Sequence, residues 1–355
     1  MTRHTLTEPW SWRPGWLPRR RARFPYARAE YEEVPCALCG ASDAEAIAQR
    51  DRNGLPVQTV ICRICGLLYI CPRMSALWYA RYYAEEYRRQ MAAYHGTDLV
   101  ADPEQLYRGQ YRRSSWLAAY LQRHGVRPRR ILEIGSSAGG LLAGLRDALG
   151  ADVLGIEPGP EEAGYANEHG VPTVCGLFEQ LAEEAIGHFD LVVCSQSFNH
   201  LLHPRRVAQK VRAALSSQGY FFLECQDFFQ VLRYKGALCH AIQIDHPYMF
   251  VPATLRGMME VSGLEIVEKT WECDAQLSDR ERQTRARLGV PTLHVRFLAR
   301  IGPVVEAPSC TYADVVGRLR ALPDRPWRAT LHTHWHRWRH RLRPYYHALK
   351  KRWAG

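Results

Sequence analysis

Between residues 130 and 301, short apolar runs alternate with helical patterns. This alternation is typical of a parallel sheet with crossover helices. The first five runs, which we expect to be strands, read RILEIG (130–135), DVLGIEP (152–158), PTVC (172–175), FDLVVCSQ (189–196) and GYFFLEC (219–225). Two longer runs, LEIVEKTWEC and TLHVRFLARI, then read as strands joined by a charged loop. The pattern predicts an α/β fold of five strand–helix units closed by a hairpin.

The turn after the first strand, LEIGSSAGG (132–140), predicts a cofactor site. Gly135 and Gly139 bracket it, and glycine lets a backbone approach a ligand closely. Dinucleotide enzymes lay a pyrophosphate on the helix that starts at this point. The carboxylate of Glu133 would repel that group, and Ser137 stands where a dinucleotide fingerprint has its middle glycine. An acidic turn instead suits a cation such as S-adenosylmethionine (SAM), so a nicotinamide dehydrogenase is the least favoured enzyme class.

A second carboxylate, Glu157, ends the next strand 24 residues after Glu133. A carboxylate at this place can accept both ribose hydroxyls of an adenosine. The alternative is a solvated acid at a strand end. Further residues expected to line the nucleoside follow the third and fourth strands, although ordinary loop chemistry would also explain them: Gly176, Leu177, Ser195 and Gln196.

Two cysteine pairs precede the α/β region. Cys36-x2-Cys39 and Cys62-x2-Cys65 are separated by 22 residues, and a glycine follows each pair. Eleven cysteines in a chain without an apparent export signal suggest a reducing compartment, where paired cysteines more often hold a metal than a disulfide. We expect a tetrahedral zinc site of four thiolates, which has no open position and is therefore structural. Four unrelated buried thiols are the alternative.

Several segments together resemble the zinc-containing class I SAM-dependent methyltransferases, whose members methylate carbon or oxygen atoms of sugars and related small molecules. The resemblance covers about residues 34–301 and implies a Rossmann-like sheet, zinc on the four cysteines, and SAM at Glu133, Gly135 and Glu157. Asn199 stands where the family usually has an acidic residue. The matching segments are CALCG (36–40), CRICGLLYICPRM (62–74), YYAEEY (82–87), ILEIGSSAGGLL, VLGIEP, FNHLLHP and DHPYMFVPATLRGMMEVSGLEIVE.

Two histidines are candidates for the general base that a protic acceptor requires. His200 follows the fourth strand, and His246 follows Asp245 between the fifth strand and the next helix. Histidine titrates near neutral pH and is the commonest such base. Asp245 would orient a histidine or bind a substrate hydroxyl, and Tyr248 is a weaker candidate for contact with the acceptor. The alternative is that either histidine caps a helix or satisfies a buried carbonyl.

The net charge of +11 is concentrated at the two ends of the chain. Residues 1–28 carry +6 and residues 325–355 carry +9, which leaves −4 for the body. In the C-terminal tail, tryptophans and leucines recur every three or four residues among basic ones. Such a helix suits an anionic membrane surface, although it could equally pack on the protein body or bind RNA.

The expected organisation has five parts. They are a basic arm (1–33), a zinc-binding module (34–74), a helical linker or lid (75–128), the methyltransferase domain (129–301), and a linker with a basic amphipathic tail (302–355). We expect a cytoplasmic enzyme, peripheral at the inner membrane surface if the tail binds a membrane, that methylates a small molecule or a sugar or glycan precursor. An RNA methyltransferase and a non-catalytic SAM- or zinc-binding scaffold are the alternatives, and the sequence leaves the oligomeric state open.

Overall fold

The computed structural model describes residues 24–95, 102–182, 187–271, 279–290 and 292–322. The N-terminal part contains strands and the helices that follow them: η1 (Tyr26–Arg28), β1 (Tyr31–Glu32), β2 (Ala44–Arg50), β3 (Pro56–Cys62), β4 (Leu68–Ile70), β5 (Arg73–Met74), α1 (Ala76–Tyr82), the π-helical turn η2 (Tyr83–Tyr87), α2 (Arg88–His95) and α3 (Pro103–Arg123).

The α/β part alternates strands and helices as far as α7. Its elements are β6 (Arg130–Ile134), α4 (Gly140–Leu149), β7 (Asp152–Glu157), α5 (Pro160–Glu168), β8 (Thr173–Cys175), η4 (Phe178–Gln180), β9 (Phe189–Ser195), η5 (Phe198–His200), α7 (Pro204–Ala214), β10 (Leu215–Gln226), α8 (Phe228–Lys235), α9 (Leu238–Ala241), β11 (Tyr248–Met249), α10 (Pro252–Val261), β12 (Leu264–Thr270), α11 (Asp279–Arg287), β13 (His294–Ile301) and α12 (Tyr312–Ala321).

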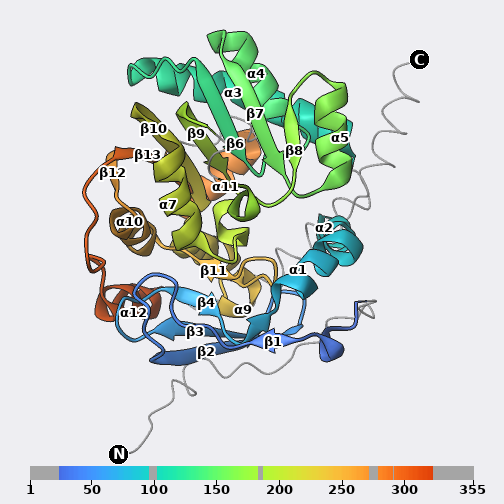
Figure 1. The fold of residues 1–355 in the computed structure, drawn as a ribbon. Helices are drawn as coiled ribbons and strands as arrows, with labels where there is room; N and C mark the ends of the chain where they lie inside the picture. Colours follow the sequence, from blue (N-terminus) through green and yellow to red (C-terminus); the bar gives the residue numbers. More distant parts are fainter. Residues whose placement is uncertain (1–23, 96–101, 183–186, 272–278, 291, 323–355) are drawn as a thin grey trace, which may run out of the picture.

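Seven of these strands form one sheet in the order β12-β13-β10-β9-β6-β7-β8 (Figure 1). β13 is antiparallel to both of its neighbours, whereas the strands from β10 to β8 are parallel. β7 and β8 extend the sheet on one side of β6, whereas β9 and β10 extend it on the other side, so the strand order reverses beside β6. Ligands of open α/β sheets bind at the carboxyl ends of the strands beside such a point. The predicted Rossmann-like α/β fold is therefore confirmed, and the sheet places residues 133–139 at the expected ligand position.

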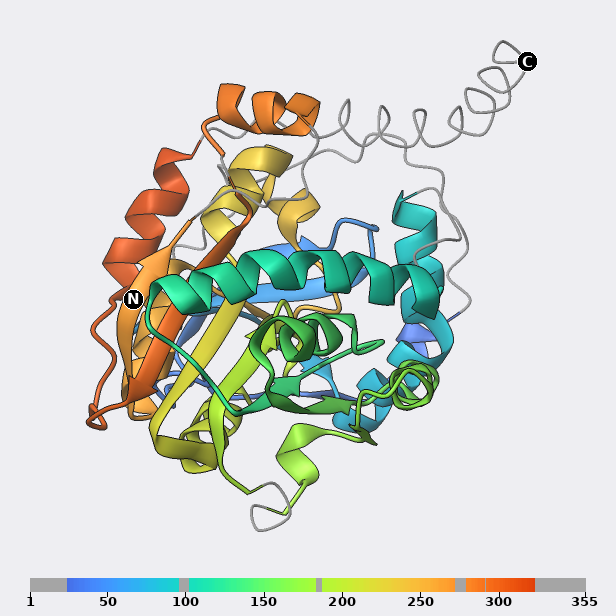
Figure 2. The ribbon, with the colours of Figure 1, turned by 90° about the horizontal axis from the view of Figure 1, so that it is seen from above.

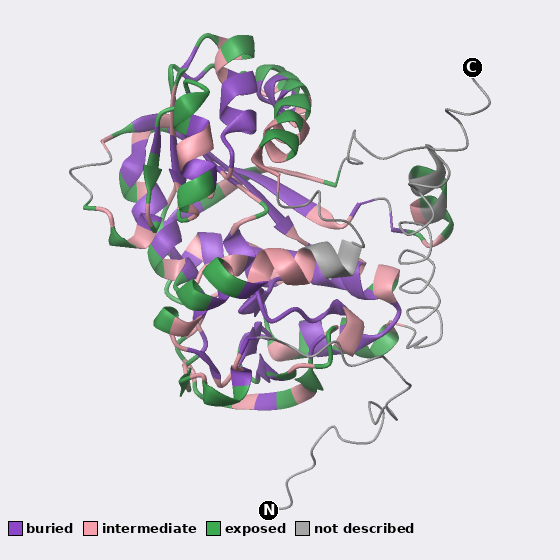
Figure 3. Cartoon of the chain, turned by 90° about the vertical axis from the view of Figure 1, so that its right-hand side faces the viewer, coloured by how far each residue is buried: buried purple, intermediate pink, exposed green. Residues whose placement is uncertain are grey.

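Neighbouring residues of a strand pack on opposite faces of this sheet, because side chains alternate along a strand. Ile131 belongs to the core beneath α3 and α4, whereas Leu132 belongs to the core on the other face, with α7 and α10. Figure 2 shows α3 and α4 together over one face. In Figure 3 most of the central strand residues are buried, while many residues on the covering helices are exposed.

Helices α3 and α4 approach closely because α4 carries glycine at two of its contacts. A Cβ at Gly140 would stand 2.0 Å from the Tyr107 carbonyl oxygen, and one at Gly144 would stand 1.9 Å from Ser114 Oγ. Any larger residue would push the two helices apart. This close packing holds α3 against the helix that begins beside the predicted cofactor turn.

The four-cysteine region joins the rest of the chain through a second sheet of four strands, in the order β11-β4-β3-β2. Its edge strand β11 comes from far along the sequence, and Tyr248 pairs with Tyr69. Ile70 also donates a backbone hydrogen bond to Pro247 O at 2.9 Å. Three of the cysteines share one apolar core with α7, α10 and the large sheet. Residues 34–74 are thus packed continuously against the α/β part.

Some segments differ from the sequence-based expectation. Residues 226–250, which show no clear periodicity, form α8, α9 and β11, and the expected charged loop before β13 contains the helix α11. Most of the basic arm (1–23) and most of the amphipathic tail (323–355) lie outside the described residues. Among the helices that the structure describes, none is long and apolar enough to cross a membrane.

Candidate active site and metal centre

The turn between β6 and α4 has the backbone geometry of a ligand-binding loop. Gly135, Ser137 and Gly139 all have positive φ, at 74°, 50° and 80°. A Cβ at Gly135 would stand 2.4 Å from Ser197 Oγ, so this position accepts only glycine without rearrangement. The loop after β9 therefore lies directly against the turn after β6, at the point where the strand order reverses.

Glu133 is the buried acid of this turn. Glu133 is 2% exposed, and its Oε2 atom has no hydrogen-bond partner among the described residues. Burial raises the pKa of Glu133 well above its usual range, and the charge of Arg113 opposes that rise. A buried carboxyl oxygen without a partner is costly and calls for a donor or a cation. The ammonium group of SAM would supply both, so the residues fit this cofactor.

Glu157 holds the turn from the next strand. Its Oε2 accepts a hydrogen bond from Ser137 N and its Oε1 accepts one from Gly159 N, both at 2.8 Å. A carboxylate has about four acceptor positions, so it could still bind ribose hydroxyls. Gly176 N donates to Glu157 O at 3.0 Å, and the side chain of the neighbouring Leu177 is exposed. These three predicted cofactor residues, with Ser137, therefore lie together.

Ser195 and Gln196 lie at the end of β9, where both contact Glu224, a residue for which the sequence predicts no role. Ser195 Oγ donates to Glu224 Oε2 at 2.9 Å, and Gln196 Nε2 donates to Glu224 Oε1 at 3.0 Å. Arg113 of α3 reaches the same carboxylate and also donates to Ser195 Oγ at 3.1 Å. In this structure both predicted cofactor residues are engaged by Glu224.

Glu224 is fully buried on β10. Burial disfavours its charge, but Arg113 and Arg296 outweigh burial and hold the pKa of Glu224 at about 2. Arg296 Nη2 lies 3.2 Å from Glu224 Oε1. The buried acid thus links β9, β10, β13 and α3. The sequence hints at this buried acid, because Glu224 interrupts the apolar run GYFFLEC. Its arginine partners are remote in the sequence and cannot be read from it.

The predicted catalytic residues His200, Asp245 and His246 form one cluster. His200 ends the short helix η5, three residues after Ser197, and Asp245 and His246 precede β11. Asp245 Oδ2 lies 3.6 Å from His246 Nε2 and 3.9 Å from His200 Nδ1, and the two imidazole rings meet edge to face. The side chain of His200 is 22% exposed, whereas that of His246 is 8% exposed.

Burial sets the protonation of this cluster. It lowers the pKa of His200 and lowers that of His246 to about 3, although the charge of Asp245 opposes both shifts. Burial also disfavours the charge of Asp245, but the adjacent His246, Arg52 and His200 keep its pKa below the usual value. Near neutral pH the cluster therefore offers two neutral imidazoles and one carboxylate. A neutral imidazole can accept a proton, which is what a general base requires.

Two further residues organise the cluster. The hydroxyl of Tyr83, in the π-helical turn, lies 3.0 Å from His200 Nδ1 and donates to Asp245 O at 3.1 Å. Arg73 Nη1 donates to Leu202 O at 2.7 Å and to the Tyr248 hydroxyl at 3.0 Å. Tyr248, a weaker candidate for acceptor contact, is 2% exposed and its hydroxyl also donates to Leu202 O. Tyr83 belongs to the segment YYAEEY, whose sequence alone predicts no role for it.

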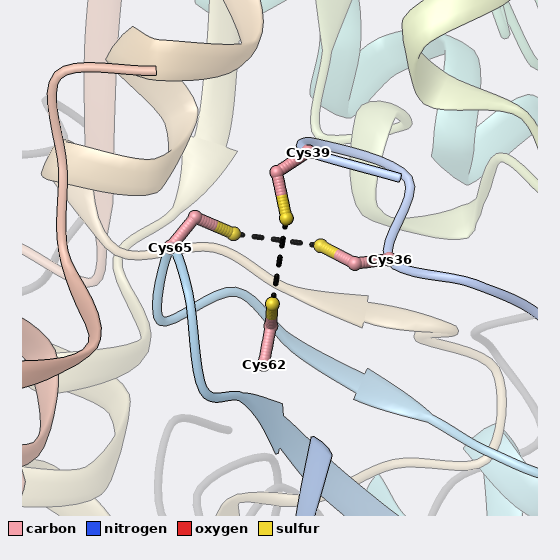
Figure 4. A group of neighbouring side chains, drawn as sticks. All are labelled: Cys36, Cys39, Cys62 and Cys65. Carbon is pink, nitrogen blue, oxygen red and sulfur yellow. Dashed lines mark hydrogen bonds between the residues drawn. The ribbon is translucent and has the colours of Figure 1, made fainter. Parts of the chain in front are cut away.

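The four predicted metal ligands converge, as Figure 4 shows. Cys36 Sγ lies 3.4 Å from Cys65 Sγ, and Cys39 Sγ lies 3.5 Å from Cys62 Sγ. The glycine after each pair has positive φ, 78° at Gly40 and 77° at Gly66. Four sulfurs directed at one point are the donor set of a structural zinc site. The ten cysteines within the described residues are free, so no disulfide competes for them.

Comparison with known proteins shows that the α/β part is similar to methyltransferases. Residues 107–269 match the family model described as methyltransferase domain. The C-methyltransferase NovU of Streptomyces niveus is 32% identical over 142 residues, which cover 39% of this chain and 33% of the relative. Ubiquinone biosynthesis O-methyltransferases are 25% identical in Paraburkholderia phymatum, over 43% of this chain and 70% of the relative, and 27% identical in Burkholderia cenocepacia, over 44% and 72%.

The solved plantazolicin methyltransferase BpumL, in complex with a monoazolic desmethylPZN analog and SAH, is 13% identical with a TM-score of 0.45. The alignment covers 63% of this chain and 94% of BpumL, a likeness too distant to bear on the site. The chain spans only about a third of NovU. The family match, the sheet order and the acidic turn after β6 agree with one another. Residues 107–269 thus match a methyltransferase domain, and their place in the sheet agrees with that match.

Proposed function

We propose that the protein transfers a methyl group from SAM to a carbon or oxygen atom of a small molecule, such as a sugar or glycan precursor. The observation that carries this proposal is the cluster of His200, Asp245 and His246 beside the cofactor turn. Ser197 contacts Gly135 and lies three residues before His200, so a base and the cofactor turn share one edge of the sheet. The C- and O-methyltransferases among the relatives support the same acceptor classes.

The cofactor site is proposed to use the residues that surround the turn after β6. SAM, when bound, supplies an activated methyl group. Glu133 would bind its ammonium group and Glu157 its ribose, while Gly135, Ser137 and Gly139 leave room for close backbone approach. The remaining candidates, Gly176, Leu177, Ser195 and Gln196, would border the nucleoside, the last two through the loop that Glu224 fixes.

Either histidine of the cluster is proposed as the general base. Its neutral imidazole would accept the proton that a hydroxyl or an acidic carbon of the acceptor releases. Asp245 would stabilise the resulting imidazolium, because its carboxylate faces both rings. Tyr83 would orient His200 through the contact at Nδ1. The acceptor would then be held for in-line transfer, which depends on orientation more than on covalent chemistry.

The test measures release of the demethylated cofactor with nucleotide-activated sugars and other hydroxyl-bearing small molecules as acceptors. We expect His200→Ala and His246→Ala each to bind SAM like the wild type, and at least one to lose roughly 100-fold or more in turnover. The exposed His188 gives the matched control, His188→Ala, with wild-type turnover. If both cluster variants keep full turnover, neither histidine is the base.

We also propose that zinc occupies the four-cysteine site and that the basic tail binds an anionic membrane surface. The zinc proposal is supported by the convergence of the four sulfurs. The tail proposal is supported by the tryptophan stripe in residues 327–353, which lie outside the described part of the chain. Deleting residues 325–355 should abolish binding to anionic liposomes and spare SAM binding. Unchanged liposome binding would contradict the membrane role, and salt-sensitive RNA binding would favour the RNA alternative.

A further inference from the structure

The cluster of His200, Asp245 and His246 has a geometry that general-base catalysis does not require. Asp245 Oδ2 faces two imidazole nitrogens at 3.6 Å and 3.9 Å, both beyond the usual hydrogen-bond range of 2.7–3.2 Å. One donor atom from each of the three residues lies within 4.8 Å of the other two. Three residues of metal-binding types therefore surround a common point without forming side-chain hydrogen bonds to one another.

The donor set defines which ions would fit that point. Two imidazoles and one carboxylate suit first-row divalent ions such as Zn²⁺, Co²⁺ and Ni²⁺, whereas Mg²⁺ and Ca²⁺ prefer oxygen ligands. Zinc ligands lie about 2.0–2.2 Å from the ion, so the three side chains would close inward by roughly a few tenths of an ångström. Three protein ligands leave one coordination position open, as in catalytic rather than structural sites.

Neighbouring side chains hold the donors in place. The amide of Gln243 lies 3.3 Å from His246 Nδ1, which leaves Nε2 directed toward Asp245. With its oxygen turned toward Nδ1, the Gln243 amide would accept the Nδ1 proton of His246. That tautomer leaves the Nε2 lone pair available to a metal. The Tyr83 hydroxyl donates to Asp245 O and therefore accepts from His200 Nδ1, so an ion at Nδ1 requires the other His200 tautomer and a shift of Tyr83. Arg73 ties Leu202, after His200, to Tyr248, after His246, so the two donor segments are joined.

One nearby charge opposes a cation. Arg52, from the hairpin between β2 and β3, donates its backbone N–H to Ile242 O at 3.0 Å and its guanidinium contacts Met91 Sδ. Its positive charge acts on Asp245 and on both histidines. An ion at the cluster would therefore bind more weakly than one at the four thiolates, and removing the Arg52 charge would strengthen the binding.

We propose that His200, Asp245 and His246 form a second metal site, selective for first-row divalent transition ions, and that an ion bound there inhibits methyl transfer. The ion would take the imidazole lone pairs that would otherwise accept the proton. The inhibitory part rests on the proposed function, whereas the binding of the ion does not. The site would make turnover sensitive to free zinc or nickel.

The binding test uses the full chain with one equivalent of zinc on the four cysteines. Ni²⁺ is titrated by calorimetry into the wild type, His246→Ala, Asp245→Asn and the control His188→Ala. The histidines of the tail are present in every variant, so the differences report the cluster alone. We expect the wild type and His188→Ala to bind one more equivalent than His246→Ala and Asp245→Asn. Equal uptake by all four proteins would overturn the proposal.

Two further variants test the proposed environment of the ion without removing a ligand. Gln243→Leu should bind Ni²⁺ about 10- to 100-fold more weakly, as expected when a neighbour that orients a metal-bound histidine is lost. Arg52→Gln should bind it several-fold more tightly, because a repelling charge is gone. Unchanged affinity in both variants would place the ion elsewhere and overturn the assignment.

The functional test adds Ni²⁺ to the wild type during turnover and then removes it with a chelator too weak to strip the thiolates. Turnover should fall at the same ion concentrations that fill the site, and it should recover on chelation. A rise in turnover would overturn the inhibitory role. Absence of methyl transfer before any ion is added would contradict the proposed function alone, because the calorimetric result would stand unaffected.

Discussion

Arg73 donates a hydrogen bond from Nη1 to the Tyr248 hydroxyl at 3.0 Å. The same nitrogen donates to Leu202 O at 2.7 Å, and Nε pairs with Glu32. The Arg73 side chain is only 3% exposed. It therefore joins three parts of the chain that are distant in sequence: β1, the segment after His200, and the strand after His246.

The first prediction concerns this arginine. Arg73→Met leaves the buried Tyr248 hydroxyl and the partly buried Leu202 O without this donor, which should lower the free energy of unfolding by roughly 1–3 kcal/mol. Urea unfolding measures the change. Arg300→Met is the control, because the Arg300–Glu265 pair is about half exposed and should contribute about 1 kcal/mol or less. Equal losses in the two variants would contradict the role assigned to Arg73.

The second prediction concerns acid stability. The folded-state pKa of Glu224 is about 2, below the value of about 4.3 for an unfolded glutamate. Its stabilising contribution is therefore complete above about pH 5 and disappears as the pH falls toward 2, with a total of about 3 kcal/mol. Glu224→Gln should be less stable than the wild type at pH 7, and the difference should narrow in acid. Unfolding free energies that fall in parallel for the two proteins would contradict this.

The third prediction concerns the four cysteines. Cys62→Ser should lose zinc, destabilise the sheet that contains β11, and reduce turnover more than SAM binding, because Tyr69 of that sheet pairs with Tyr248 near the histidines. Metal content per chain, thermal unfolding and turnover are the measurements. Cys175→Ser, at an exposed cysteine, should behave like the wild type. Normal stability and turnover in a metal-free preparation would refute a structural zinc role.

The fourth prediction concerns the turn after β6. Gly135→Ala forces a side chain into a positive φ and against Ser197, at a cost of about 1–3 kcal/mol. If the turn must keep its shape to bind SAM, this cost corresponds to roughly 10- to 100-fold weaker binding. The control Gly164→Ala places its Cβ in open space within α5 and should bind SAM normally. Full affinity in Gly135→Ala would show that the turn does not contact the cofactor.

Local patterns in the sequence predicted the sheet and the convergence of the cysteines. The alternation of strands and helices, the glycine turn and the cysteine spacing each depend on neighbouring residues, so they can be read directly. The Glu224 network could not be predicted, since Arg113 lies far before Glu224 in the sequence and Arg296 lies far after it. Strand β11 has only two residues, and its pairing with β4 links positions about 180 residues apart. Neither the Glu224 network nor the pairing of β11 with β4 produces a periodic pattern in the sequence.

Tyr83 illustrates a different difficulty. It lies in a π-helical turn, whose residues do not follow the 3.6-residue period that sequence patterns reveal. Its hydroxyl reaches His200, although the sequence separates the two residues by 117 positions. The histidines and Asp245 were predicted from their places after strands, which is sequence information. The hydrogen bond of Tyr83 depends on how the π-helical turn packs, which only the structure defines.

The most direct test of the proposed cofactor site is calorimetric titration of SAM into the wild type and Glu133→Gln, with NAD⁺ as the comparison ligand. We predict that the wild type binds SAM and its demethylated product but not NAD⁺, because a bound ammonium group would stabilise the ionised carboxylate of the buried Glu133, whereas a diphosphate would not. Glu133→Gln should bind SAM roughly tenfold or more weakly, equivalent to about 1.4 kcal/mol. A wild-type protein that binds neither SAM nor the demethylated product would contradict the proposed cofactor site.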